Sequence, residues 1–305
     1  MIGVQGEQTM NRIWRARFVG AALVSFAISG SAWADTVAYW QFDADGSGTY
    51  SNASVGGPAY NLVAVGGPFS QSALSAVNPI PNPDATPGFV GSPSVNSGSL
   101  FSVANQTRYM RTSGDATVEL TLAGSSTWTI EGWYNLYALP GTTLDIIWTT
   151  RDSASGFAGM TLQMNTANQL EFVVQQGGGI STNLVTSSGT STGEWHHVAL
   201  TYDAGVGNGT FDLYLNGVSA GVVEIPVAMT PATVDTSDLG YLAFGGRAAS
   251  SNSVAGRLDE WRISDQALTP DQFLNYVPEP STFALILCGL AMAWRRGRRN
   301  AGRAE

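Results

Sequence analysis

The 305-residue sequence contains no lysine and only one cysteine, Cys288. All 14 basic residues are therefore arginine, and only six of them fall within residues 35–276, together with 20 acidic residues. This segment has a formal charge of −14, which the charge of −9 for the whole chain conceals. Because a surface that follows phosphates needs clustered cations, we expect no nucleic-acid partner. Cys288 lies in the apolar run near the chain end, so residues 35–276 have neither a disulfide nor a thiolate metal site.

The first 34 residues are typical of a secretory signal peptide. Three arginines at positions 12, 15 and 17 precede an apolar stretch, residues 18–28, and the small residues at 32 and 34 match the signal peptidase pattern. Cleavage after Ala34 would make Asp35 the mature N-terminus. We expect translation to start at Met10, because residues 1–9 match no region of a signal peptide.

Residues 277–305 have three parts in a fixed order. A Pro-Glu-Pro motif is followed by an apolar run, residues 283–294, and then by a block of four arginines; the residues concerned are Pro278, Glu279, Pro280, Arg295, Arg296, Arg298 and Arg299. The prolines delay the start of a helix, and the arginines are typical of a stop-transfer block that stays cytoplasmic. Residues 281–294 give about 21 Å of helix against a hydrocarbon core of about 30 Å, which indicates a transient membrane hold.

This order resembles the PEP-CTERM sorting signal of exopolysaccharide-producing Gram-negative bacteria. The resemblance implies that an exosortase in the inner membrane processes the segment, and that the protein is delivered to the cell surface or the extracellular matrix. An ordinary single-span anchor and a buried core helix are the alternatives.

Between the two signals, residues 35–276 read as one large all-β domain. Short β-type runs alternate with Gly, Ser, Asn and Asp, and they predict strands at residues 37–42, 117–122, 127–136, 144–149, 160–164, 170–174, 194–202, 211–215, 218–225, 241–244 and 257–263. Residues 46–96 are rich in Gly, Pro and Asn and predict long surface loops with room for a strand or two. The one helical signal is a capping box at residues 269–273.

Four segments carry a second resemblance: Trp128-Thr129-Ile130-Glu131-Gly132-Trp133, the run from Glu194 to Asp203, Leu213-Tyr214-Leu215-Asn216-Gly217, and the run from Gly256 to Ile263. They are similar to strands of laminin-G-like, concanavalin A-like jelly rolls. The resemblance implies a jelly-roll sandwich over residues 35–276, and Asn216-Gly217 is a strong hairpin-turn signal.

The alternation of side chains refines this expectation. Both faces of residues 194–203 are partly apolar, which predicts a central strand. In residues 257–263, Leu258 and Trp261 have opposite parity, so we expect a β-bulge at Asp259-Glu260.

The candidate catalytic patterns are weak. Residues 189–193 match G-x-S-x-G, but Ser191 follows a Ser/Thr/Gly-rich loop and precedes a β run, whereas a nucleophile elbow needs a helix there. Glycoside hydrolysis needs two facing carboxylates, and we find no Glu-x-Asp-x-x-Glu run. His196 and His197 point to opposite faces, which indicates structural histidines and no shared metal. We therefore expect no enzyme activity.

Two kinds of binding site are candidates. Asp43 and Asp45 lie in an Asp/Gly/Ser-rich turn with oxygen ligands at alternate positions, as in calcium loops; an ordinary turn is the alternative. The jelly-roll resemblance implies Asp259 as a second calcium ligand. For glycan contact, Trp133 has the parity opposite to Trp128, and Trp148 lies at a strand end.

Taken together, the sequence predicts an exported surface or matrix protein that binds glycan or mediates adhesion without catalysis. Its partners would be signal peptidase and an exosortase during processing, the inner membrane in transit, and exopolysaccharide or another glycan afterwards. The alternatives are a carbohydrate-active enzyme, hydrolase or lyase, on the same fold, and a structural matrix protein with no ligand.

Overall fold

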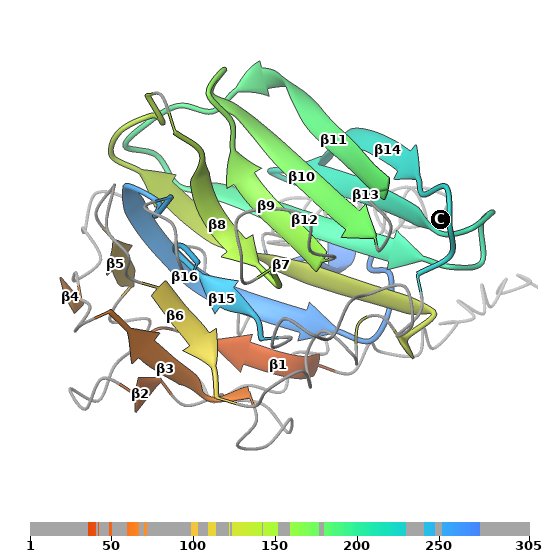
Figure 1. Ribbon diagram of the computed structural model, residues 1–305, viewed down its shortest axis with the longest axis horizontal. Helices are drawn as coiled ribbons and strands as arrows, with labels where there is room; N and C mark the ends of the chain where they lie inside the picture. The colour runs from red at the N-terminus through yellow and green to blue at the C-terminus, as the bar shows by residue number, and fades with distance from the viewer. Residues whose placement is uncertain are drawn as a thin grey trace, which may run out of the picture. The chain divides into compact units, whose positions relative to one another are not determined.

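The computed structural model describes residues 36–40, 42, 49–50, 60–66, 70–71, 99–102, 109–113, 122, 124–141, 143–151, 159–176, 180–229, 241–247 and 252–274. These residues form two eight-stranded sheets that lie face to face (Figure 1). The predicted jelly-roll sandwich is confirmed. In the described part of the chain no helix is long and apolar enough to cross a membrane. The predicted signal and tail helices lie outside it.

The first sheet, sheet A, has the strand order β14-β13-β12-β7-β16-β5-β4, and β1 also pairs with β16. Its strands are β1 (Thr36–Trp40), β4 (Ser70–Gln71), β5 (Leu100–Ser102), β7 (Thr127–Leu136), β12 (His196–Asp203), β13 (Thr210–Leu215), β14 (Val218–Glu224) and β16 (Gly256–Ser264). As predicted, the strand at 196–203 is central, because β12 lies between β13 and β7.

The second sheet, sheet B, has the order β11-β10-β9-β8-β15-β6-β3-β2. Its strands are β2 (Thr49–Tyr50), β3 (Leu62–Val65), β6 (Tyr109–Thr112), β8 (Asp145–Thr149), β9 (Gly159–Met164), β10 (Gln169–Gln176), β11 (Ile180–Gly189) and β15 (Ala243–Phe244). The sequence patterns did not predict β11, β5 or β6, and the range predicted at 117–122 lies almost wholly outside the described residues.

The core between the sheets is rich in aromatic side chains. Phe172 of β10 contacts Phe211 of β13 with ring centroids 4.8 Å apart, and Phe244 of β15 contacts Trp261 of β16 at 5.4 Å. Edge-on and tilted ring pairs of this kind contribute beyond the area that they bury. With no disulfide available, these contacts hold the two sheets together.

Three local signals are confirmed. Asn216 and Gly217 both have positive φ, at 52° and 77°, as the tight β13–β14 hairpin requires. The register of β16 against β7 shifts between Asp259 and Arg262, and Glu260 has φ 52°, so the predicted bulge is present. The capping box begins the short 3₁₀ helix η4 (Pro270–Gln272).

We expect Gly132→Ala to lower the free energy of unfolding by about 1–3 kcal/mol, the usual cost of overpacking a core. A Cβ at Gly132 in β7 would overlap the indole ring of Trp261, which is fully buried. Gly141→Ala is the matched control, because a Cβ there meets nothing within 4 Å. Urea unfolding of both variants measures the difference, and equal stability would contradict the packing described here.

Candidate functional site

The outer face of sheet A is covered by the chain that follows β16. Gln266 accepts a hydrogen bond from Thr129 Oγ1 at 2.7 Å through its carbonyl oxygen, and Leu268 N–H donates to the same hydroxyl at 2.8 Å. Phe273 is fully buried against the rings of His197 and Tyr214. This face is therefore closed to a large ligand along β7 and β12.

A buried charged group fastens that covering segment. Glu131 of β7 is fully buried and accepts hydrogen bonds from Arg262 Nε at 2.8 Å, from Arg262 Nη2, and from Leu274 N at 2.8 Å. Its second oxygen also lies 3.0 Å from His197 Nε2, and Arg262 Nη2 donates to the Gln272 carbonyl at 2.8 Å. We call Glu131, Arg262 and His197 the buried clasp.

The clasp sets the charge of Glu131. Burial by itself raises the pKa of this carboxyl, but attraction by Arg262 and hydrogen bonds from His197 and Leu274 together hold the pKa below its ordinary value. The carboxylate is thus ionised and fully committed to protein partners. Its role is structural, which agrees with the expected structural role of His197.

The outer face of sheet B is different, because no described strand or helix crosses it (Figure 1). One row of directly paired residues runs across this face, through Val63, Arg111, Ala243, Thr149, Thr161, Val173 and Asn183. Paired residues point to the same side of a sheet. The two threonines in the middle are buried and lie 2.7 Å apart, so the accessible parts of the row are its two ends.

At the β9–β11 end, the face carries a polar strip, defined as Gln163, Glu171, Ser181 and Asn183. Gln163 Nε2 donates to Glu171 Oε2 at 2.8 Å, and Asn183 Nδ2 donates to Glu171 Oε1 at 3.1 Å. Ser181 Oγ donates to Asn183 Oδ1 at 3.3 Å. Amides and a carboxylate held in this way leave further donors and acceptors for the hydroxyls of a sugar.

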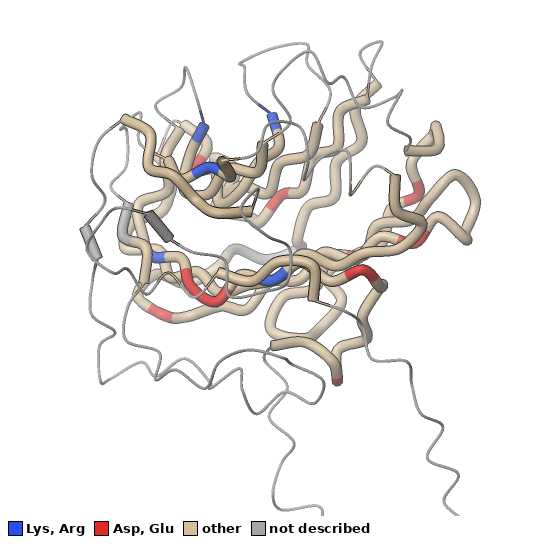
Figure 2. The backbone as a smooth tube through the Cα atoms, turned by 90° about the horizontal axis from the view of Figure 1, so that it is seen from below, with Lys and Arg blue, Asp and Glu red and all other residues tan. Residues whose placement is uncertain are grey.

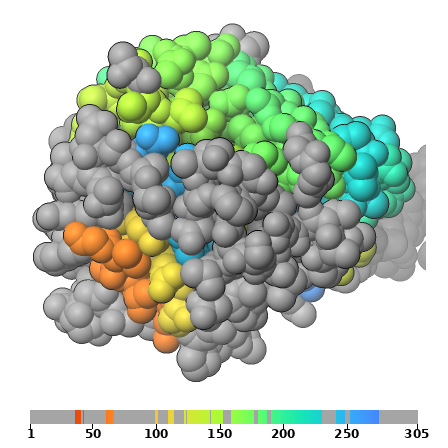
Figure 3. Space-filling model, viewed as in Figure 1, coloured from red at the N-terminus to blue at the C-terminus, as the bar shows by residue number. Residues whose placement is uncertain are grey.

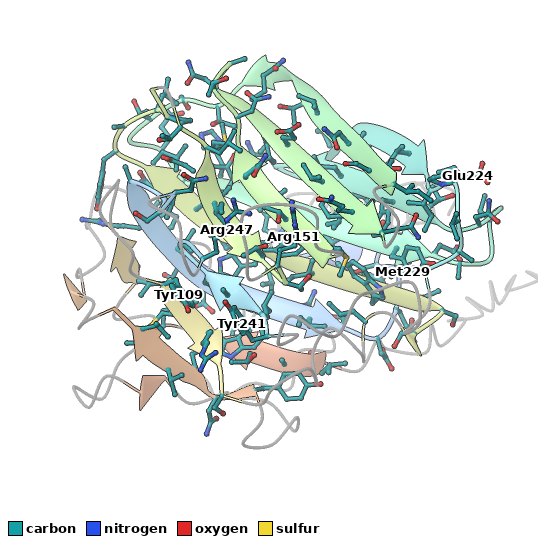
Figure 4. All side chains as sticks on the ribbon, in the orientation of Figure 1. Tyr109, Arg151, Glu224, Met229, Tyr241 and Arg247 are labelled. Atoms are coloured by element: carbon teal, nitrogen blue, oxygen red, sulfur yellow. The ribbon has the colours of Figure 1, made fainter. Side chains whose placement is uncertain are left out.

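At the other end lies an arginine cluster, defined as Arg111, Arg151 and Arg247. Arg111 belongs to β6, while Arg151 and Arg247 follow β8 and β15, and β15 lies between β6 and β8 in the sheet. The Arg111 guanidinium lies 5.0 Å from the ring centre of Tyr241. In Figure 4, Arg151 and Arg247 lie side by side, close to Tyr109 and Tyr241.

A third arrangement joins Ser191 to His196. Ser191 Oγ lies 3.1 Å from His196 Nε2 and donates to Glu194 Oε2 at 2.6 Å, while Asn216 Nδ2 lies 3.3 Å from His196 Nδ1. The geometry resembles a nucleophile, a base and an orienting residue, although the sequence context argued against catalysis.

The hydrogen bonds of Asn216 indicate the tautomer of His196. Asn216 Oδ1 accepts from His197 N at 2.9 Å, so Asn216 presents its N–H to His196 Nδ1. Neutral His196 then carries its proton on Nε2 and donates to Ser191, and burial, opposed by the Ser191 carbonyl and Glu194, keeps its pKa below the ordinary value. Gly193 N–H is already bonded to the Leu136 carbonyl at 2.7 Å. His196 is therefore in the wrong tautomer to accept the Ser191 proton.

Comparisons with known proteins agree with this architecture. The model for the laminin-G-type group of the concanavalin A-like lectin/glucanases superfamily matches residues 95–273. The chain belongs to this superfamily. No curated protein matches the chain.

Several solved structures share the superfamily fold. Domain 4 of AbnA, a GH43 extracellular arabinanase from Geobacillus stearothermophilus in complex with arabinotriose, has a TM-score of 0.53 and 18% identity, covering 78% of this chain and 96% of that one. The receptor binding domain of botulinum neurotoxin C/D mosaic serotype has a TM-score of 0.50 and 12% identity, over 78% and 49% of the two chains. The CBM40 of Ruminococcus gnavus IT-sialidase has a TM-score of 0.46 and 14% identity, over 58% and 94%.

On this superfamily scaffold, both tryptophans predicted for glycan contact are buried. Trp148 is 0% exposed because the register of β8 shifts between Ile146 and Trp148, which turns its ring into the core. Trp133 does point to the outer face of sheet A, but it is only 8% exposed and contacts His197. Neither ring offers a stacking surface, so this prediction was wrong.

The structure describes only some of the other predicted site residues. Asp259 is fully buried at the bulge, where its Oδ1 accepts from Glu260 N at 2.9 Å, and burial raises the pKa of the neighbouring Glu260 carboxyl to about 8. Among the described residues, no group of three or more His, Cys, Asp or Glu side chains is placed to hold a metal. Calcium binding stays a prediction, since Asp43 and Asp45 lie outside these residues. So do Ala34, Asp35, the Pro-Glu-Pro motif and the four tail arginines.

Sequence patterns missed both ends of the sheet B face. The polar strip depends on β11, whose alternation of Ile180, Thr182, Leu184 and Thr186 was a readable signal. The arginine cluster had no local signal, because its members are far apart in the sequence and meet only through strand pairing.

We expect Glu131→Gln to lower the free energy of unfolding by about 3–5 kcal/mol at pH 7, because it leaves Arg262 charged and buried. Since the folded pKa of Glu131 is depressed, its contribution is present above the unfolded pKa and is lost as the pH falls through the folded pKa. Urea unfolding at pH 7, 5 and 3 should show a smaller loss of stability towards acid in the variant than in the wild type. Glu224→Gln, at an exposed carboxylate, is the control. A Glu131→Gln variant as stable as the wild type at pH 7 would contradict the clasp.

Proposed function

We propose that this protein is an exported, non-enzymatic glycan-binding protein whose ligand lies across the outer face of sheet B. The observation that carries the proposal is that the two ends of one row on sheet B carry partly exposed polar and charged side chains, while the middle of that row is buried. Residues 265–274 cover the outer face of sheet A, whereas sheet B presents the polar strip and the arginine cluster at the two ends of one row of paired residues.

The chemistry of this face suits a saccharide. Glycans are recognised by convergent hydroxyl, amide and charged groups, with apolar contacts between them. The polar strip supplies the amides and a carboxylate, and Val173 and Val185 lie beside it on the same face. Domain 4 of AbnA, which shares the fold, was solved with arabinotriose, and that ligand is consistent with a saccharide here.

Catalysis is not favoured by the same face. Acid and base catalysis of glycoside cleavage needs two carboxyl groups about 5–10 Å apart. On the outer face of sheet B, Glu171 is the only carboxylate that the described strands supply, and amide donors already occupy both of its oxygens. Asp145, the other strand carboxylate of sheet B, accepts from Ala255 N and is buried.

Binding to a glycan array tests the proposal. We expect the exported domain to retain at least one glycan, and Glu171→Ala to weaken that binding roughly 10-fold or more, as loss of a charged hydrogen bond usually does. Asp271→Asn on η4, at the other sheet, should leave binding unchanged. Absence of any retained glycan would favour the structural matrix protein, and release of reducing sugar from a bound polysaccharide would favour the enzyme.

We also propose that the protein reaches the cell surface or matrix after two cleavages, one after Ala34 and one near residues 278–280. The motif order at the two ends of the sequence supports this route. Intact-mass analysis of the exported protein should give a chain that starts at Asp35 and ends close to the Pro-Glu-Pro motif. A mass that includes the four tail arginines would show a retained membrane anchor instead.

A further inference from the structure

The arginine cluster is unusual for this chain. Residues 35–276 contain six arginines against 20 acidic residues, yet three of the six lie on, or just after, the adjacent strands β6, β15 and β8 of sheet B. Figure 2 shows blue segments together at the top of the picture, on the outer side of one of the two layers. Half of the cations of a strongly acidic domain are thus concentrated at one end of the proposed glycan face.

Burial and charge repulsion both act against the positive charge of Arg151. Burial lowers the pKa of Arg151, and repulsion from Arg247 lowers it further. The Nε atoms of Arg111 and Arg151 are buried and donate no hydrogen bond. No ion pair joins Arg111 or Arg151 to a carboxylate in the described part of the chain.

Aromatic neighbours fix part of the cluster in place. Tyr241 is held between the guanidinium of Arg111 and the ring of Tyr109, whose centroid lies 6.1 Å away in a stacked arrangement. Both tyrosines are buried, so they position the arginine and do not serve as an open stacking surface. A guanidinium held in this way loses little freedom when it binds a planar anion.

We infer that the arginine cluster binds the carboxylate of an acidic sugar, so that the ligand of this protein is an anionic glycan such as a uronic-acid polysaccharide. This inference rests on the proposed glycan-binding function. Arginine forks match the planar carboxylate with two parallel hydrogen bonds, and a partly buried site strengthens charged hydrogen bonds. A bound carboxylate would also relieve the repulsion between Arg151 and Arg247.

The spacing on the face suits an extended ligand. Five strand intervals of about 4.8 Å separate Arg111 from Asn183, or roughly 24 Å across the sheet. A single sugar therefore cannot reach both ends. A chain of several sugars is long enough to place one carboxylate in the arginine cluster while its neutral hydroxyls meet the polar strip.

The net charge of the domain makes the local cluster necessary. A segment with a formal charge of −14 repels an acidic polymer at long range, and screening at physiological salt limits that repulsion to about 8 Å. Recognition must then come from short-range contacts to the arginines. Figure 3 shows the β10–β11 part of this face at the surface of the molecule, where Glu171 and Val173 are partly exposed.

The test is a panel of oligosaccharides in matched pairs, each uronic-acid member beside its carboxyl-reduced neutral counterpart, measured by calorimetry with the mature domain. We expect the acidic member to bind at least 10-fold more tightly. Arg151→Gln combined with Arg247→Gln should remove that preference. Arg257→Gln makes the same type of charge change in β16 of sheet A, where Arg257 lies over Tyr137, and should keep the preference.

The outcomes distinguish a failure of the acidic-glycan inference from a failure of the proposed glycan-binding function. Equal binding of both members of each pair, or a preference that survives in the double variant, would overturn the acidic-glycan inference while leaving glycan binding intact. Failure of every oligosaccharide to bind would contradict the proposed function itself. Thermal unfolding checks that the variants fold. If the double variant does not fold, Arg151→Gln and Arg247→Gln are tested separately.

Discussion

The buried carboxylate of Glu131 is the interaction on which the arrangement of this molecule depends. It ties β7 to β12 through His197 and to β16 through Arg262, and it also holds the main chain at Leu274. A buried charge of this kind is tolerable only when every partner is in place. The segment from Asp265 to Leu274 is consequently part of the fold, and it closes one outer face of the sandwich. The glycan-binding face that we propose is therefore the outer face of the opposite sheet.

The sequence predicted much of the fold, because alternation is a strong signal wherever one side of a strand faces an apolar core. Residues 127–136 form a strand with the predicted bounds, and the bulge at Asp259-Glu260 followed from a break in parity. The failures have identifiable causes. Trp148 was misplaced because its position at a strand end suggested exposure, whereas its ring points into the core. Trp133 was misplaced because a distant segment covers a face whose orientation was predicted correctly.

The candidate site was harder to predict than the fold. Arg247 lies near the strands of Arg111 and Arg151 because β15 pairs with both β6 and β8, which precede β15 by more than 90 residues in the sequence. No spacing rule within one strand contains that information. The two eight-stranded sheets therefore determine the site through their strand order, and the individual motifs contribute little.

The arginine cluster is a candidate site without a sequence motif, whereas the Ser191 region has a motif but no catalytic arrangement of hydrogen bonds. There the letters G-x-S-x-G and the contacts to His196 both suggest a nucleophile, whereas the strand that follows in place of a helix and the direction of the hydrogen bonds argue against one. The Asn216 amide, fixed by the His197 N–H, makes His196 a donor towards Ser191, and Ser191 in turn donates to Glu194. Each of the donors in this series of hydrogen bonds points towards an acceptor, so the arrangement stabilises the loop that precedes β12. The distances between Ser191, His196 and Asn216 would by themselves suggest a catalytic site, whereas the donor and acceptor roles of these residues favour a structural function.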